Sequence, residues 1–338
     1  VSAGGAAVEM PPRSGALLVR RGRGLEPVFH SHRLPPGRLR RRMLPADVPI
    51  SWEMLPEPVP GHGPDAGRTF VPVRLPHNML LETRDETDYG AYRAAVHSAS
   101  TRTASLRTHV ADLLCAFVNG RFVGAAPGRL KENRTRRGDF AVSLSLPLRK
   151  GDNELVLVVS SMGLVKHDVM LGRAMSKERK GLIGAVTIDG RAVRGWQFSP
   201  ATWGEAHLLP LPEAASLVRW RRPARGGGPF RWYRGTFALA GRHLASGAPW
   251  ALDVGGLFKG LLWINGNCLG RYWQEPSRPD DLAAETWQQE HVHLEGVGAP
   301  PQRFYQIPPD WLREGANTLI VLEERGALPG AAGLVRRK

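Results

Sequence analysis

Residues 117–124 read FVNGRFVG, and residues 263–270 read WINGNCLG. In both stretches an Asn-Gly step stands between apolar, strand-like residues. This step is the strongest short-range signal for a β-hairpin, because both central residues of the turn need positive φ. One such turn alone is a weak signal. Its occurrence twice in similar surroundings predicts two copies of one β-rich plan.

Two further blocks repeat in the same order around these turns. Residues 88–96 (DYGAYRAAV) are echoed by residues 230–237 (FRWYRGTF), and both combine an aromatic-Arg step with an alternating pattern. Residues 148–158 (LRKGDNELVLV) are echoed by residues 312–322 (LREGANTLIVL), where a turn leads into an apolar strand. Three blocks in one order predict two homologous β-domains that differ in their loops.

The predicted fold class is therefore all-β, with two homologous jelly-roll-like β-sandwiches and an N-terminal β fragment. We expect a mobile tail over residues 1–15. Residues 16–80 are predicted to hold a fragment of a preceding β-region and a connector rich in Pro and Gly. The first sandwich is expected over residues 81–220 and the second over residues 221–338.

The charge of the chain is strongly positive, with a formal net charge of +15 over 338 residues. Of 46 basic residues 39 are arginine, which reflects either codon composition or selection for an anionic partner such as RNA, an acidic lipid or an acidic protein. The densest run is Arg38, Arg40, Arg41 and Arg42. It is either a solvated loop or a basic docking patch. No apolar run is long enough to predict a membrane span.

The residues with metal-binding or redox chemistry are few and scattered. Cys115 and Cys268 are the only cysteines, and each lies in an apolar, strand-like run. We expect both to be buried thiols without a disulfide. The histidines lack metal-ligand spacing, and no phosphate-binding loop or paired catalytic carboxylates can be recognised. The sequence thus predicts no catalytic residue, cofactor or metal in this chain.

A resemblance to a known family rests on several motifs. They are TRDETDY at residues 83–89, GLIGAVTI at 181–188, WGE at 203–205, LGRYW at 269–273 and QRFYQIP at 302–308. In this order they resemble the C-terminal, non-barrel part of plant-type family 35 β-galactosidases, which are glycoside hydrolases. The resemblance implies galactose-binding-domain-like sandwiches, and it extends from about residue 28 to the end of the sequence.

Two departures from that family bear on function. The resemblance implies a catalytic barrel with two glutamates, and a (β/α)8 barrel of ~250 residues has no counterpart in this sequence. We therefore expect this chain to be inactive alone. Plant members often carry a cysteine-containing insertion after the GRYW step, whereas QEPSRP follows it here. Its loss favours a reducing intracellular or organellar compartment over secretion.

The same step supplies the candidate site. Aromatic rings stack on sugar C–H surfaces and arginine donates to hydroxyls, so Arg271, Tyr272 and Trp273 are predicted to contact a sugar or a partner. The alternative is packing surface. Glu323 and Glu324, at the end of an apolar strand, are expected to be solvated or paired with arginine.

Two classes of function remain open. In the first, the chain is a non-catalytic structural or binding protein of β-galactosidase descent, a pseudoenzyme that acts as a scaffold subunit in a complex with other proteins. In the second, it is the carbohydrate-contacting and barrel-supporting part of an active β-galactosidase whose barrel lies on another segment. The basic charge and the missing cysteines favour the first class, whereas the near-complete match to the family favours the second.

Overall fold

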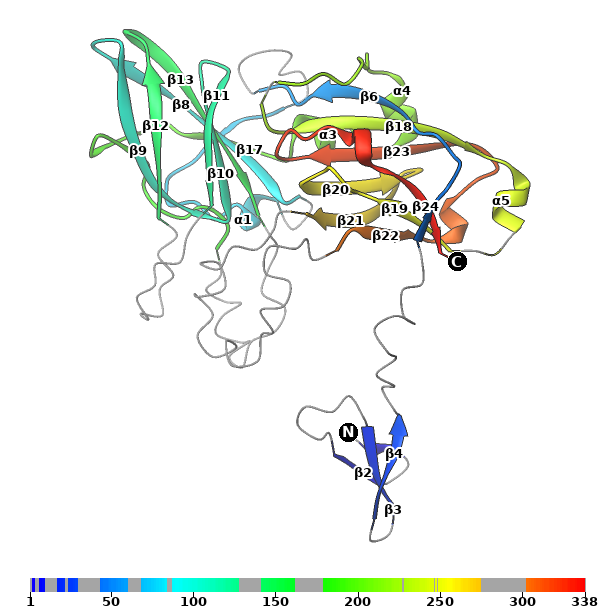
Figure 1. Cartoon of the computed structure of the whole chain (residues 1–338). Coiled ribbons are helices and arrows are strands. Elements are labelled where there is room, and N and C mark those ends of the chain that lie inside the picture. Colours follow the sequence, from blue (N-terminus) through cyan, green and yellow to red (C-terminus); the bar gives the residue numbers. More distant parts are fainter. Residues whose placement is uncertain are drawn as a thin grey trace. The chain divides into compact units, whose positions relative to one another are not determined.

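A computed structural model describes residues 2–3, 6–9, 17–21, 24–29, 43–59, 68–83, 87–127, 141–161, 179–226, 228–245, 247, 249–274 and 302–337. The chain divides into two compact units, residues 1–44 with 337–338, and residues 45–336. In the first unit, four strands form an antiparallel sheet in the order β1-β2-β3-β4 (Figure 1). They are β1 (Ser2–Ala3), β2 (Ala6–Glu9), β3 (Leu17–Arg21) and β4 (Gly24–Phe29).

The sheet of the first unit corresponds to the predicted N-terminal β fragment, but its extent differs from the prediction. Strands β1 and β2 lie in residues 1–15, where we expected a mobile tail. The predicted docking patch at Arg38, Arg40, Arg41 and Arg42 lies outside the described residues.

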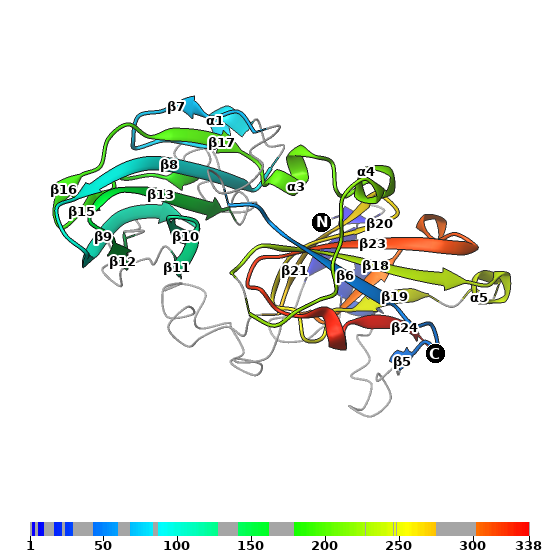
Figure 2. The same cartoon turned by 90° about the horizontal axis from the view of Figure 1, so that it is seen from above.

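The second unit contains two β-sandwiches, which Figure 2 shows from above. In the first sandwich a six-stranded sheet has the order β11-β10-β13-β8-β17-β7. Its strands are β7 (Val71–Pro72), β8 (Tyr89–Ser98), β10 (Leu113–Val118), β11 (Arg121–Pro127), β13 (Gly151–Ser160) and β17 (Gln197–Pro200). It packs on a sheet made of β9 (Arg102–Ala111), β12 (Ala141–Leu148), β14 (Gly181–Leu182), β15 (Thr187–Ile188) and β16 (Arg191–Ala192). Leu106, Leu146 and Leu157 lie in the core between them.

The second sandwich repeats this plan. Its five-stranded sheet has the order β21-β20-β23-β18-β6, with β6 (Ser51–Pro56), β18 (Arg231–Leu239), β20 (Lys259–Ile264), β21 (Asn267–Trp273) and β23 (Gly315–Glu323). The facing sheet has the order β22-β19-β24-β5, with β5 (Met43–Pro45), β19 (Trp250–Asp253), β22 (Phe304–Ile307) and β24 (Gly333–Arg337). Tyr233, Leu262 and Val321 lie in the core between these sheets.

Short helices connect the strands. The α-helices are α1 (Leu80–Thr83), α3 (Trp203–Ala206), α4 (Pro212–Ser216) and α5 (Gly241–Ala245). Two single-turn 3-10 helices are η1 (Pro309–Trp311) and η2 (Pro329–Ala331). The all-β prediction is confirmed, because antiparallel strands build both sandwiches.

The two repeated turns occupy equivalent places. Asn119-Gly120 joins β10 to β11, and Asn265-Gly266 joins β20 to β21; all four residues have positive φ, between 49° and 86°. In both hairpins the strand pairing shifts register shortly before the Asn-Gly turn. The shift lies between Ala116 and Phe117 in the first hairpin and between Leu262 and Trp263 in the second. A bulge retained at the same place in both hairpins supports a common plan.

A buried asparagine fixes the position of each turn. Asn317 donates from Nδ2 to the carbonyls of Arg313 and Gly315, and its Oδ1 accepts from the Arg313 amide and from Asn265. Asn153 makes the same set of contacts with Arg149, Gly151 and Asn119. The repeated LRxGxN motif is therefore a side-chain lock that joins two neighbouring turns.

The domain boundaries differ from those expected. Strand β6 was expected in a preceding β-region, but it pairs with β18 and completes the second sandwich. Strand β7, only some fifteen residues later in sequence, pairs with β17 of the first sandwich. Strands β6 and β7 thus belong to different sandwiches. Pairing partners this far away in sequence are decided by tertiary packing, not by the local pattern.

We predict that Asn317→Ala lowers the free energy of unfolding by about 2–4 kcal/mol, because several buried polar groups lose their partner. The matched control is Asn267→Ala: Asn267 is exposed and makes one long hydrogen bond of 3.4 Å. We expect that control to stay within ~0.5 kcal/mol. Urea unfolding curves of the two variants test this, and equal midpoints would refute the lock.

Candidate functional site

Arg271, the first residue of the predicted site, lies between the two sandwiches. It extends from β21, and its Nη1 atom lies 2.8 Å from Oε1 of Glu324. Its Nη2 atom lies 2.6 Å from Oδ2 of Asp88 and 3.1 Å from the Ser161 carbonyl, both in the first sandwich. Burial by itself lowers the pKa of Arg271, but Tyr89, Glu324 and Asp88 raise it above its ordinary value. Arg271 is thus a charged link between domains.

Tyr272 and Trp273 point to opposite faces of β21, as neighbours on a strand must. Tyr272 is fully buried in the core of the second sandwich, and its hydroxyl donates to Oε2 of Glu323 over 2.6 Å. Its ring therefore has no surface to offer a ligand. Trp273 is half-buried, with Nζ of Lys259 lying 4.8 Å from its ring centroid. The structure thus separates the three predicted site residues.

Glu324 is the centre of the contacts between the sandwiches. Its side chain has no exposed surface, and Nζ of Lys259 lies 2.8 Å from its Oε2 atom. Tyr89 and Ser160 of the first sandwich donate hydroxyl hydrogen bonds to the same carboxylate, over 2.8 and 3.0 Å. We call Asp88, Tyr89, Ser160, Lys259, Arg271 and Glu324 the seam cluster.

The electrostatics of the seam cluster favour ionised groups. Burial alone raises the pKa of Glu324, but the Lys259 ammonium and the Arg271 guanidinium hold it below its ordinary value. Burial and the neighbouring Glu324 charge raise the pKa of Tyr89, so its hydroxyl stays protonated and can donate. A charge this deeply buried is tolerated only when it is paired and hydrogen-bonded.

The neighbouring carboxylate, Glu323, has a different role. It accepts hydrogen bonds from Tyr272, from the Phe258 amide and from the Arg325 amide. Burial raises the pKa of Glu323 although these hydrogen bonds oppose the shift. The expectation of a solvated end at Glu323 and Glu324 is wrong, since both are fully buried, whereas the expected arginine pairing holds for Glu324.

A second buried carboxylate network lies where α3 meets the connector. Glu57 accepts from the Trp203 and Gly204 amides at the start of α3 and from Nε1 of Trp232, and Arg68 lies 3.8 Å away. Glu205 accepts from Thr202 and Thr87, forming the capping box of α3. Burial raises the pKa of Glu57 and raises that of Glu205 to about 7.

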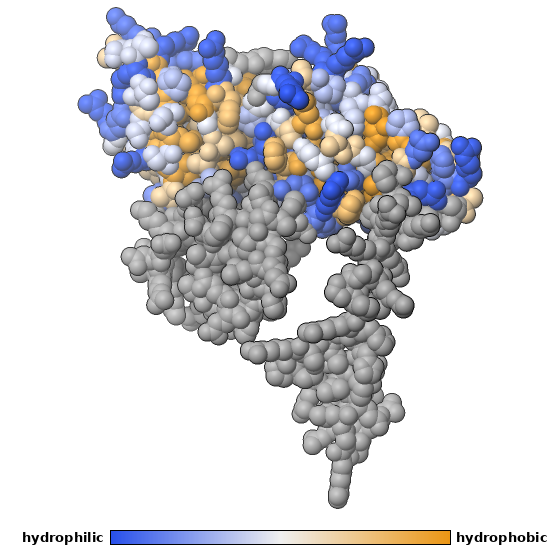
Figure 3. All heavy atoms as spheres, viewed as in Figure 1, coloured by the Kyte–Doolittle hydropathy of each residue, from blue (hydrophilic) through white to orange (hydrophobic). Residues whose placement is uncertain are grey.

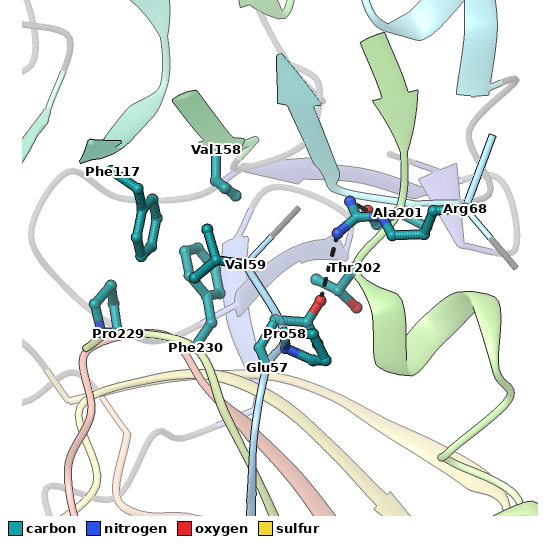
Figure 4. Close-up of a pocket in the computed structure, with 10 residues that line it drawn as sticks. All are labelled: Glu57, Pro58, Val59, Arg68, Phe117, Val158, Ala201, Thr202, Pro229 and Phe230. Atoms are coloured by element: carbon teal, nitrogen blue, oxygen red, sulfur yellow. Dashed lines mark hydrogen bonds and ion pairs between the residues drawn. The ribbon is translucent and has the colours of Figure 1, made fainter. Parts of the chain in front are cut away.

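The cavity beside Glu57 is small. Figure 4 shows Glu57 and Arg68 at one end and the rings of Phe117 and Phe230 at the other. Its volume is about 20 Å³, which is room for about one water molecule. Ligand pockets are typically 300–1,000 Å³. The perturbed carboxylates of this network therefore have no adjoining space for a sugar ring.

Metal and thiol chemistry is not prominent in the described part of the chain. No group of three or more His, Cys, Asp or Glu side chains there is placed to hold a metal ion. Cys115 is buried as expected, but Cys268 is exposed because it points outward from β21, and neither forms a disulfide. No helix among the described residues is long and apolar enough to cross a membrane.

Sequence reasoning missed Lys259, Asp88 and Glu57 as parts of buried networks. Lys259 and Glu57 could have been suspected, because each is a charged residue next to an apolar strand. Nothing in the local sequence shows that Lys259, which pairs with Glu324, and Asp88, which pairs with Arg271, enter one network, since they come from different sandwiches. Trp232, Tyr233 and Trp263 are buried core residues.

We predict that Lys259→Met lowers the free energy of unfolding by about 3 kcal/mol, because Glu324 loses a buried partner. The control, Lys150→Met, changes an exposed turn residue and should stay within ~0.5 kcal/mol. The double variant Lys259→Met/Glu324→Gln should recover part of the loss. Denaturant unfolding measures all three, and a loss no larger than that of the control would contradict this role of the seam cluster.

We also predict a pH dependence of stability from Glu205. Its pKa of about 7 in the folded chain lies above the ordinary value of 4.5, so the folded state binds the proton more tightly. The resulting stabilisation is complete below about pH 4.5 and is lost as the pH rises to about 7, by roughly 3 kcal/mol. Glu205→Gln should reduce this slope, whereas the exposed control Glu213→Gln should keep it. Unfolding midpoints between pH 4.5 and 8 test the difference.

Comparison with known proteins supports the resemblance found in the sequence. Residues 230–317, in the second sandwich, match the family model described as "Beta-galactosidase, galactose-binding domain". Over 276 residues the chain is 27% identical to β-galactosidase 3 of Oryza sativa subsp. japonica, covering 75% of this chain and 31% of that protein. The chain thus spans about a third of the length of that relative.

Similar solved structures are distant. A putative β-galactosidase from Bacteroides fragilis has 13% identity and a TM-score of 0.26, covering 83% of this chain and 36% of that one. A lectin from Pleurotus ostreatus has 13% identity and a TM-score of 0.22, covering 86% and 78%. The assignment therefore rests on the sequence matches. By these matches, the chain is similar to the C-terminal, galactose-binding-domain region of plant β-galactosidases.

Proposed function

We propose that this chain is a non-catalytic structural and binding protein of β-galactosidase descent, acting as a scaffold subunit of a larger protein assembly. The observation that carries the proposal is the use of the buried carboxylates. Glu324 joins the sandwiches, Glu323 holds Tyr272, and Glu57 and Glu205 anchor α3. Among the described residues these contacts stabilise the fold, and the cavity beside Glu57 is too small for a sugar ring.

The chemistry of glycoside hydrolysis supports the same proposal. A retaining enzyme needs two carboxyl groups about 5–5.5 Å apart on either side of a sugar ring, and an inverting enzyme needs a still wider gap. Glu57 is a buried carboxylate with a raised pKa that lines a cavity, and the volume of that cavity is about 20 Å³. The cavity beside Glu57 is thus too small to hold a sugar ring, which supports a structural role for this carboxylate.

Exposed apolar side chains give the scaffold proposal a surface. Leu217 and Leu208 are 86% and 59% exposed, and both lie in the segment that carries α4. Arg219, Arg221 and Arg222 are exposed immediately after it. In Figure 3 hydrophobic and hydrophilic residues are mixed over the coloured part of the face in view. Large exposed apolar groups beside charges are typical of protein-binding surfaces.

The second candidate function is the carbohydrate-contacting and barrel-supporting part of an active β-galactosidase. It is favoured by the similarity to a plant β-galactosidase over 75% of the chain. Under that proposal the same rigid pair of sandwiches would support a catalytic domain on another segment. The two candidates differ in what accompanies the chain in its native state.

We predict that the chain, purified natively at low salt, elutes in a complex with other proteins and releases them at high salt, because ionic contacts by exposed arginines weaken with screening. Mass spectrometry of the native complex identifies the partners. The isolated chain should not hydrolyse a chromogenic β-galactoside. A natively monomeric chain would contradict the scaffold proposal.

Turnover needs its own control. The matched variants are Glu205→Gln, at a buried carboxylate, and Glu213→Gln, at an exposed one. Hydrolysis by the pure chain that is lost in either variant would show that the chain carries catalytic carboxylates. Hydrolysis only by a complex with a second polypeptide would support the β-galactosidase candidate.

A further inference from the structure

The two sandwiches carry equivalent arginines on the outer faces of their larger sheets. Arg93 in β8 lies opposite Gln197 in β17, and its Nε donates to the Gln197 side chain over 2.8 Å. Arg234 in β18 lies opposite Glu53 in β6 and donates to that carboxylate over 2.9 Å. Each guanidinium also lies over an aromatic ring, Phe70 at 4.0 Å and Trp220 at 5.1 Å. The internal repeat thus extends to side-chain contacts.

In the second sandwich, the α4 segment covers this outer face. The carbonyl of Ala215 accepts a hydrogen bond from Nη1 of Arg234 over 3.2 Å, and Ala215 is 1% exposed. At the other end of the segment, Leu211 and Pro212 lie beside Gly266. A Cβ atom added to Gly266 would lie 3.3 Å from the Leu211 side chain and 3.7 Å from the Pro212 side chain. The segment therefore spans the face from the Asn265-Gly266 turn to Arg234.

The corresponding place on the first sandwich is an open hollow of about 560 Å³. It extends from Asn119, in the equivalent Asn-Gly turn, to Arg93, in the equivalent arginine position. Ala95 and Gln197 form part of its floor, and its described lining comes only from the first sandwich. The hollow therefore lies between an Asn-Gly turn and an arginine on the first sandwich. On the second sandwich, α4 lies between the equivalent turn and the equivalent arginine.

The charges of the hollow restrict what it can bind. Arg93 and Arg149 are balanced by Asp152 and Glu154, so the lining has no formal net charge. A balanced surface does not attract a polyanion such as a nucleic acid. Alternating donors and acceptors suit a polypeptide, whose main chain offers both. The C-terminal carbonyls of a helical turn carry partial negative charge and suit a guanidinium.

We propose that this hollow is a docking site for a short helical turn of a partner protein, which lies on the first sandwich as α4 lies on the second. Small side chains of the turn face Ala95, and its C-terminal carbonyl oxygens accept from Arg93. The proposal rests on the proposed scaffold function and names the surface that would serve it. The internal repeat supports the proposal, because the equivalent outer face of the second sandwich already holds a short helix, α4.

The chain's own α4 segment provides a probe. We expect an acetylated, amidated and fluorescein-labelled peptide of residues 207–217 (HLLPLPEAASL) to bind the full chain saturably in a fluorescence polarisation titration. Ala95→Trp fills the hollow from an exposed strand position and should weaken binding about tenfold or more. Ala192→Trp places the same side chain at an exposed position on the other sheet of the first sandwich, and it should leave binding unchanged.

Hydrogen exchange gives a second measurement that does not depend on a variant. The peptide should slow amide exchange in residues 93–97 and 149–154, which border the hollow. No saturable binding, equal binding by the two Trp variants, or protection elsewhere would overturn the proposal. Lactose is the competing probe: if it protects these residues and the peptide does not, the hollow is a sugar site. These outcomes are separate from native complex formation and β-galactoside turnover, which test the proposed function itself.

Discussion

The ion pair between Lys259 and Glu324 is the interaction on which the arrangement of the two sandwiches depends. Lys259 is 1% exposed and Glu324 is fully buried, so each charge would be severely destabilising alone. The carboxylate also accepts from Tyr89 and Ser160, which the first sandwich supplies. Separation of the sandwiches would remove these donors. Electrostatics therefore add to apolar contacts in holding residues 45–336 in one compact unit.

Around this pair the outer faces of the two larger sheets form a third apolar cluster. Phe117 and Val156 of the first sandwich meet Trp232, Trp263 and Ile320 of the second, and α4 contributes Ala215. Phe117 and Trp263 precede the equivalent Asn-Gly turns, so the repeat places an aromatic residue from each copy at the contact. The copies thus share one framework and differ in what covers its outer face.

The perturbed carboxylates of this chain have structural causes. Burial raises the pKa values of Glu57, Glu205 and Glu323, and each carboxylate is anchored by main-chain amides or hydroxyls of adjoining segments. Shifted pKa values are often associated with active sites, but ion pairs and helix caps inside a fold produce them as well. In the described part of the chain, the cavity that Glu57 lines has a volume of about 20 Å³, which is too small for a sugar ring.

The sequence by itself determined the all-β class, the duplication and the Asn-Gly turns, because positive φ and strand alternation are local properties. It also singled out residues 270–273 (GRYW) as a candidate site. Tertiary structure alone decided that Tyr272 lies in a core, that Arg271 joins two domains, and that β6 and β7 enter different sandwiches. Burial and pairing of these residues depend on partners between about 50 and 180 positions away in the chain. A local sequence pattern does not indicate such partners, because the charged side chains and the strand edges come together only when the chain packs.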